Sequence, residues 1–246
     1  MRIIVVKDKK QMGVRAAQLI AAEMKKKHFV LGLATGSTPI PLYQELIRAN
    51  KAGELDFATV ITFNLDEYVG LPATHDQSYR YFMNQELFDH INIDKKNTHV
   101  PNGMAKDIDG ECDEYEATID DVGGIDYQVL GIGSNGHIGF NEPGSSLGSL
   151  TRIKTLTLKT RQDNARFFKS LDEVPKYAIT MGIGSVMKAQ KVVLMANGAN
   201  KADAVKAALE GPVMAMCPAS ALQLHRFATY IVTEDAASKL TLPVEK

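Results

Sequence analysis

The sequence predicts an α/β protein, Rossmann-like, with a doubly wound, mostly parallel sheet and helices on both faces, in a single domain over residues 1–246. Two observations lead to this prediction. Short apolar runs, rich in Val, Ile and Leu, alternate with segments whose apolar residues recur at helical spacing, which is typical of a parallel sheet covered on both faces. No internal repeat, low-complexity segment or linker divides the chain.

Six apolar runs are predicted strands: Ile3–Val6, Phe29–Ala34, Val60–Leu65, Tyr127–Gly133, Lys191–Ala196 and Thr229–Thr233. A seventh run, Tyr177–Gly182, is a further candidate. The predicted helices lie between them: one with a stripe of Met12, Ala16, Leu19 and Ile20, one from about Pro39 with Leu42, Tyr43, Leu46 and Ile47 on one face, and two at Cys112–Val122 and Lys201–Glu210.

The composition is that of an ordinary globular protein, with 246 residues, a formal net charge of −1 and 45% hydrophobic residues. No basic excess exists to neutralise phosphates, so we expect no nucleic-acid partner. The apolar runs are too short for a signal peptide or for the roughly 20 residues of a membrane span, so we expect no membrane partner and a cytoplasmic location. The two cysteines, Cys112 and Cys217, are expected to be reduced and packed as small hydrophobic residues.

Ligands of such sheets bind beyond the carboxyl ends of the strands, so the loops after strands are the candidate sites. The first loop contains Thr35, Gly36, Ser37 and Thr38 ahead of a helix that begins near Pro39. A glycine that allows close backbone approach, two hydroxyls and a helix N-terminus together predict a phosphate site. The Gly-Lys-Ser/Thr of a P-loop is absent. An ordinary helix cap formed by Ser37 or Thr38 explains the same residues equally well.

The second loop places Asp66 and Glu67 directly after the third predicted strand. A carboxylate in this position can act as a general base, with a pKa set by burial and by its neighbours. The alternative is a loop carboxylate that caps a turn, which for any single Asp is the commoner case.

The third loop, Gly131–Gly144, has three glycines at the G-x-G-x-x-G spacing of a dinucleotide-binding fingerprint. Its context excludes that interpretation, because the glycines come halfway along the chain and the residues after them are poor helix formers. About 20 residues further on, where the fingerprint needs an acidic residue, Thr151–Thr155 is basic.

We interpret these glycines as forming a tight loop that places His137 and Glu142 at the end of the strand. A histidine in such a position, with Asn135 and Glu142 as orienting groups, is a candidate acid–base catalyst. A metal site is not expected, because His137 and Glu142 are the only ligand-type pair in the loop and the HExxH pattern is absent.

Four cations complete the candidates: Arg152, Lys154, Arg166 and Lys201. Scattered cations usually belong to the solvated surface. Arg152 and Lys154 alternate in TRIKT, however, so they would project to one face of an extended segment and could hold an anion.

Five segments together resemble the glucosamine-6-phosphate deaminase family along nearly the whole chain: TFNLDEYVGLP, GIGSNGHIGFNEPGSSL, TRIKTLT, ARFF and VPKYAITMGIG. The first two are long and specific. The resemblance implies isomerisation coupled to hydrolytic deamination, in which glucosamine 6-phosphate and water give fructose 6-phosphate and ammonia. It also implies that no metal or organic cofactor is needed.

By position in these motifs, the resemblance implies that Asp66 is the enolisation base and that His137 opens the pyranose ring. Some members carry Asp where this chain has Asn135. Because Asn cannot ionise, the resemblance implies that Glu142 is the partner that tunes His137. Ser37, Arg166 and Lys201 correspond to phosphate-binding positions, and Arg152 and Lys154 lie close to where some members bind an allosteric activator.

Two other functions stay open. A lactonase similar to 6-phosphogluconolactonase shares a glycine-rich loop with Gly-His, but we would not expect it to carry the Asn-Glu-Pro or Asp-Glu-Tyr-Val-Gly segments. A sugar-phosphate-sensing module normally has an added DNA-binding segment, whereas this chain begins with its first strand. We expect a monomer or a small homo-oligomer, and the short stretch after the last strand favours a form without allosteric activation.

Overall fold

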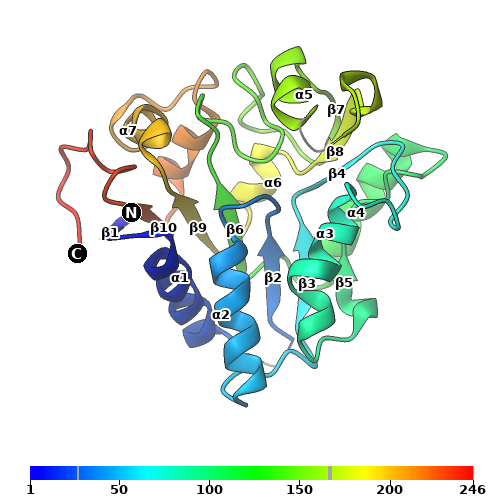
Figure 1. The fold of residues 1–246 in the computed structure, drawn as a ribbon, viewed down its shortest axis with the longest axis horizontal. Coiled ribbons are helices and arrows are strands. Elements are labelled where there is room, and N and C mark those ends of the chain that lie inside the picture. The colour runs from blue at the N-terminus through cyan, green and yellow to red at the C-terminus, as the bar shows by residue number, and fades with distance from the viewer. Residues whose placement is uncertain (27, 166–167, 246) are drawn as a thin grey trace.

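The computed structural model describes residues 1–26, 28–165 and 168–245 (Figure 1). Its centre is a seven-stranded sheet with the order β1-β10-β9-β6-β2-β3-β5, in which all neighbouring strands are parallel. The strands are β1 (Arg2–Val6), β2 (Val30–Leu33), β3 (Ile61–Asn64), β5 (Thr98–His99), β6 (Tyr127–Gly131), β9 (Lys191–Ala196) and β10 (Ala228–Thr233). The predicted parallel sheet is confirmed, and the six predicted strands are all present with ends that differ by no more than two residues.

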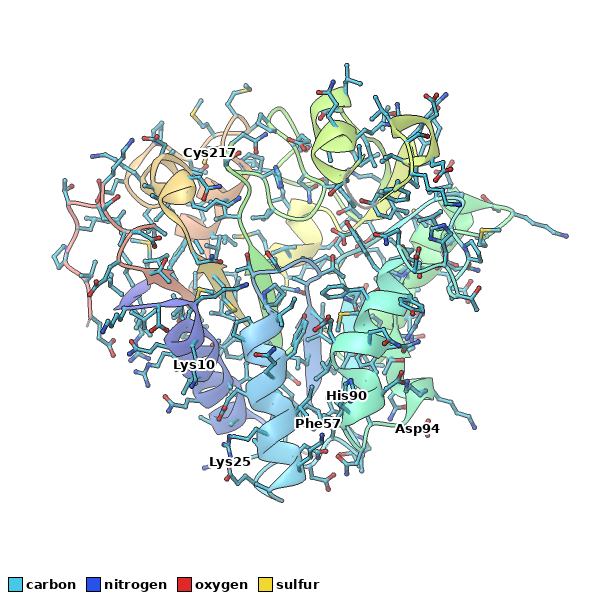
Figure 2. All side chains as sticks on the ribbon, viewed as in Figure 1. Lys10, Lys25, Phe57, His90, Asp94 and Cys217 are labelled. Carbon is cyan, nitrogen blue, oxygen red and sulfur yellow. The ribbon has the colours of Figure 1, made fainter. Side chains whose placement is uncertain are left out.

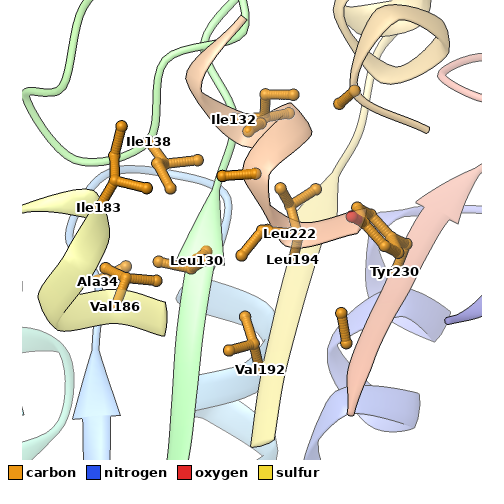
Figure 3. Packing of buried hydrophobic residues seen from close by; sticks show 14 of the residues in the cluster. Ala34, Leu130, Ile132, Ile138, Ile183, Val186, Val192, Leu194, Leu222 and Tyr230 are labelled. Atoms are coloured by element: carbon orange, nitrogen blue, oxygen red, sulfur yellow. The ribbon is translucent and has the colours of Figure 1, made fainter. Parts of the chain in front are cut away.

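Helices cover both faces of this sheet, which confirms the doubly wound arrangement. One face packs against α1 (Lys9–Glu23), α2 (Ile40–Lys51) and α3 (Tyr79–Glu86), and the other against α4 (Ile108–Asp121), α6 (Ile183–Met187) and α7 (Ala202–Glu210). Successive strand residues point to opposite faces, so Val129 of β6 belongs to the first core and Leu130 to the second. Figure 3 shows the second core, where Leu130 and Leu194 lie below Ile132 and Ile138 of the following loop.

The helices begin where local caps place them. The helix predicted at Cys112–Val122 is α4, which begins four residues earlier because the side chain of Asp107 accepts a hydrogen bond from the backbone N–H of Gly110. The helix predicted from Lys201 is α7, and a 3₁₀ turn, η5 (Ala199–Lys201), leads into it.

The seventh apolar run forms a strand, β8 (Tyr177–Thr180), but this strand does not join the main sheet. It lies in a separate antiparallel sheet, between β4 (Asp66–Tyr68) and β7 (Arg152–Thr155). The extended conformation expected for TRIKT is thus confirmed as β7. The strands β4 and β5 were not predicted, because two or three residues are too few to show a periodicity.

Both cysteines are buried free thiols, as predicted. Figure 2 shows Cys217 at the top of the view, away from Lys25 and Asp94 at the bottom. Its sulfur fills the space beside Gly136, where an added Cβ would lie 2.7 Å from Sγ. Burial raises the pKa of both thiols, that of Cys112 to about 11, so both are poor nucleophiles. None of the described helices has the length and apolar character of a membrane span.

Candidate active site

The carboxyl ends of four neighbouring strands, β9, β6, β2 and β3, open onto one cavity of about 310 Å³. The connections from β2 and β6 run to opposite sides of this point, so the cavity lies where the strand order reverses, the usual ligand site of such sheets. Its lining includes Thr35, Gly36, Ser37 and Thr38 after β2, Asp66 after β3, Gly133, Ser134 and His137 after β6, and Lys201 after β9.

Most of the predicted site residues are therefore brought together. Asn135 and Glu142 lie behind His137, in contact with it but outside the cavity lining. Arg152 and Lys154 are half-buried on the edge strand β7 and are not among the described residues that line the cavity. Arg166 lies outside the described residues.

The loop after β2 forms the end of the cavity suited to an anion. Gly36 has a φ of +87°, in the left-handed region that favours glycine, and turns the chain into α2. The N-cap residue of α2 is Pro39, and within the described chain no side chain caps this helix, so the alternative of a cap formed by Ser37 or Thr38 is wrong. Both residues line the cavity instead, beside the positive end of the helix dipole and with Lys201 in the same lining.

A buried tyrosine fixes this loop at its start. The hydroxyl of Tyr43, on α2, accepts a hydrogen bond from the backbone N–H of Ala34 at 3.2 Å and donates one to the carbonyl of the same residue. The end of β2 is therefore held against α2, and the following residues keep their place at the cavity wall.

Asp66 is the acidic group of the cavity and is only 5% exposed. Burial, and secondly the charge of Glu67, raise its pKa to about 8. Gly139 packs closely against it, since an added Cβ there would lie 3.3 Å from Oδ2 of Asp66. A carboxyl group with a pKa near neutrality suits proton abstraction from carbon, because it can both take up and return a proton at physiological pH.

The loop after β6 arranges three side chains in series. Oδ1 of Asn135 lies 2.7 Å from Nδ1 of His137, and Nδ2 of Asn135 donates a hydrogen bond to Oε2 of Glu142 at 2.7 Å. The direct distance from Nδ1 of His137 to Oε2 of Glu142 is longer, 3.5 Å. Asn135 thus stands between His137 and Glu142, so both residues expected to orient the histidine lie beside it.

This series fixes the proton on the histidine. His137, whose Nδ1 lies 3.5 Å from Oε2, lowers the pKa of Glu142 to about 2 against the effect of burial, helped by Thr160 and Asn135, so Glu142 is ionised and can only accept. Asn135 must then turn its NH₂ group toward Glu142 and its oxygen toward His137. That oxygen accepts from Nδ1–H, which leaves Nε2 as the basic nitrogen of the neutral ring.

Several lining residues lie outside the predicted site. Tyr79 of α3 and Phe140 of the loop after β6 line the cavity with parallel rings 6.1 Å apart, and Thr160 and Asn164 come from α5 (Leu158–Asn164). Phe140 lies inside the glycine-rich loop and could have been included. No local pattern marks Tyr79, because only the fold brings α3 to the cavity. Over the described parts of the chain, no cluster of three or more His, Cys, Asp or Glu side chains is placed to hold a metal ion.

Comparison with known proteins identifies the class. Residues 7–231 match the family described as glucosamine-6-phosphate isomerases and 6-phosphogluconolactonases, and the chain belongs to this family. Within it, the sequence is 57% identical over 242 residues to a glucosamine-6-phosphate deaminase of Shewanella woodyi, which covers 98% of this chain and 92% of that protein. It is 55% identical over 241 residues to the glucosamine-6-phosphate deaminase of Clostridium perfringens strain SM101, covering 98% of this chain and all of that protein.

Among solved structures, a deaminase is also more similar to this chain than the lactonases are. A structure described as a monomeric glucosamine-6-phosphate deaminase superposes with a TM-score of 0.94 at 44% identity, over 97% of this chain and 99% of that one. The 6-phosphogluconolactonase of Thermotoga maritima superposes with a TM-score of 0.72 at 20% identity, over 94% of this chain and 99% of that one, and this likeness shows the fold alone. The resemblance stated from the sequence motifs is confirmed.

Proposed function

We propose that this chain is a glucosamine-6-phosphate deaminase that acts as a single domain and converts glucosamine 6-phosphate and water to fructose 6-phosphate and ammonia. The observation that carries the proposal is the pairing of Asp66, a buried carboxyl group with a pKa of about 8, with His137, a histidine whose tautomer is fixed, in one cavity with an anion-binding end. The identity of 57% to a named deaminase supports this choice of substrate.

The phosphate of the substrate binds at the α2 end of the cavity. Ser37 and Thr38 supply hydroxyl and backbone donors there, and Lys201 supplies positive charge. Arg166 is a second cation assigned by the family resemblance alone. Because the phosphate does not react, its binding energy serves to position C2 of the sugar against Asp66.

His137 opens the sugar ring. Its Nε2 takes the proton of the anomeric hydroxyl and delivers a proton to the ring oxygen as the bond between C1 and that oxygen breaks, which produces the open-chain aldehyde. The ring of His137 carries a positive charge between these two steps. The ionised Glu142, 3.5 Å from Nδ1 and linked to it through Asn135, stabilises that charge.

Asp66 then carries out the isomerisation. Its ionised form removes the proton on C2, which the neighbouring aldehyde acidifies. The aldehyde oxygen takes a proton from water, so a neutral enolamine forms between C1 and C2. Asp66 returns a proton to C1, so the nitrogen on C2 becomes an iminium group. Water adds to C2 and ammonia leaves, which gives the ketone of fructose 6-phosphate. The substrate supplies the nitrogen of the imine, and the proposal therefore includes no metal or organic cofactor.

The direct test measures products from purified protein. Glucosamine 6-phosphate should yield fructose 6-phosphate and ammonia in equal amounts, and glucosamine without the phosphate should be a very poor substrate. Hydrolysis of 6-phosphogluconolactone is the matched control and should not be accelerated. Lactone hydrolysis without ammonia release would assign the protein to the lactonases, and sugar-phosphate binding with neither reaction would assign a sensing function.

Arg152, Lys154 and the assembly state belong to the same proposal. We propose a cytoplasmic monomer or small homo-oligomer, in which these two cations contact an anion outside the cavity. Measuring ammonia release with and without N-acetylglucosamine 6-phosphate tests whether such an anion changes the rate. Sedimentation of the same sample gives the number of chains.

A further inference from the structure

Glu142 is held at both of its carboxylate oxygens by donors from different parts of the chain. Oε2 accepts the hydrogen bond from Asn135 and faces His137, while Oε1 accepts a hydrogen bond from the hydroxyl of Thr160 at 2.7 Å. Thr160 belongs to α5, 18 residues further along the chain. The carboxylate cannot turn about its last torsion without losing one of these two anchors.

The hydroxyl groups of Thr157 and Thr160 can donate their hydrogen bonds in only one order. Ionised Glu142 only accepts, so the one hydroxyl hydrogen of Thr160 points to Oε1. The hydroxyl of Thr157, 2.9 Å from that of Thr160, must then donate to the Thr160 oxygen. Thr157 is also the N-cap residue of α5 and accepts the backbone N–H of Thr160 at 3.1 Å. The same side chain therefore starts α5 and orients the hydroxyl that holds Glu142.

We propose that Thr160 is a positioning residue for the deamination, acting through Glu142: its hydroxyl holds Oε1, so that Oε2 stays toward Asn135 and His137. This role rests on the proposed function. The torsion of a terminal carboxylate is broad and roughly two-fold, so one anchor alone does not fix it. With Thr160 in place, the orientation of Glu142 sets the orientation of the Asn135 amide, and the amide keeps Nε2 of His137 as the basic nitrogen.

The alternative role for Thr160 is direct contact with the substrate, because its side chain also lines the cavity. The two roles differ in what they change. A substrate contact made equally in the ground and transition states changes KM, whereas a positioning residue for the acid–base group changes kcat.

The experiment compares Thr160→Val, which removes the hydroxyl and keeps the shape, with Thr160→Ser, which keeps the hydroxyl. Thr160→Val should lower kcat for glucosamine 6-phosphate by about 10-fold, the size expected for one hydrogen bond to a charged group, with KM changed by less than about 2-fold. Thr160→Ser should restore kcat to within about 3-fold of the wild type. Thr155→Val, at an exposed threonine of β7, is the matched control and should keep the wild-type kcat.

A second background separates action through Glu142 from any other effect. In Glu142→Gln the carboxylate is already lost, so adding Thr160→Val should cause no further loss of kcat. A Thr160→Val protein with the wild-type kcat, a change in KM alone, or the same loss in both backgrounds would each overturn the proposal. A wild-type protein that releases no ammonia would instead refute the proposed function, and the role of Thr160 with it.

Discussion

Asp66 and Glu67 are adjacent in the chain and both are buried, yet their carboxyl groups lie on opposite sides of strand β4 and have different partners. Asp66 lines the cavity. Glu67, 3% exposed, accepts three backbone hydrogen bonds, from Tyr68 at 2.8 Å, from Tyr79 at 2.9 Å and from Arg80 at 3.0 Å. Successive side chains of a strand point to opposite faces, so Asp66 faces the cavity while Glu67 faces α3. The Glu67 carboxyl group accepts the backbone N–H groups at the start of that helix.

Asp66→Asn removes the proposed base and keeps a similar shape. We expect turnover of glucosamine 6-phosphate to fall by a factor of roughly 100 or more, while binding at the phosphate end is retained. Activity is followed by ammonia release and binding by the shift of the thermal midpoint with the sugar phosphate, since a ligand of the folded state raises that midpoint. Turnover near the wild-type rate would rule out Asp66 as the base.

The isotope test belongs to the same prediction. With the wild-type protein in deuterium oxide, some deuterium should appear at C1 of fructose 6-phosphate, because the single proton held by Asp66 can exchange before it returns. Loss of both turnover and thermal shift in Asp66→Asn would mean that Asp66 is structural, and the base would then lie elsewhere.

The buried carboxyl group of Asp66 should also make stability depend on pH. Its pKa is about 8 in the folded protein against the ordinary 3.8, so between these values the folded state binds more protons than the unfolded state. Wild-type stability therefore falls as pH rises through this window. Asp66→Asn lacks this ionisable group and has no such loss. The free energy of unfolding of the variant minus that of the wild type should be larger at pH 9 than at pH 5 by about 2 kcal/mol or more. Urea unfolding at the two pH values measures this difference, and an equal advantage at both would contradict it.

Glu67→Ala should destabilise the fold without removing a group from the cavity. Three backbone N–H groups lose their acceptor: that of Tyr68, which is buried, and those of Tyr79 and Arg80 in the first turn of α3, which are partly buried. We therefore expect a loss of at least about 2 kcal/mol in the free energy of unfolding. Ser78→Ala is the matched comparison, because the Ser78 side chain accepts one backbone N–H, that of Tyr81, and donates one hydrogen bond, to the carbonyl of Ala73 at 3.3 Å, and its loss should cost about 1 kcal/mol. Equal losses in the two variants would show that Glu67 contributes no more than a single cap.

Glu142→Gln should slow turnover far more than Asn135→Asp. The first change removes the negative charge that stabilises protonated His137 and allows the Asn135 amide to turn over. The second keeps an acceptor 2.7 Å from Nδ1 of the ring. Steady-state rates of both variants with glucosamine 6-phosphate provide the measurement. If Asn135→Asp is the more damaging change, the supporting role has been given to the wrong residue.

Removal of divalent metals should leave the deaminase rate unchanged. The proposed proton transfers use only Asp66 and His137, and the imine nitrogen comes from the substrate. Ammonia release is measured before and after incubation with EDTA, followed by addition of Mg²⁺ or Zn²⁺. Activity that is lost on chelation and restored by one of these ions would overturn the cofactor-free mechanism.

The sequence by itself determined the type of sheet and most of the loops that form the cavity. Continuous apolar runs such as Lys191–Ala196 specify strands buried on both faces, because only that environment accepts Val and Leu on every side. Parallel strands then bring their carboxyl ends to one edge, so the residues after them, including Ser37, Asp66 and His137, were expected to meet. Local sequence patterns suffice to predict an element whose own residues show the periodicity of a strand or a helix.

Only the tertiary structure decided what depends on contacts between distant segments. The apolar pattern of β8 fits a strand of the main sheet as well as a strand of the small antiparallel sheet. Its pairing with β4 and β7 is set by the path of the chain in the fold, not by that pattern. The pKa of Asp66 depends on burial in the folded chain, and Tyr79 reaches its cavity only through the packing of α3. The hydrogen bond from Thr160 to Glu142 joins helix α5 to the loop after β6, and no sequence pattern links the two residues. Burial and hydrogen-bond partners are properties of the assembled chain, so a sequence can name the reacting groups but not the environment that sets their pKa values and orientations.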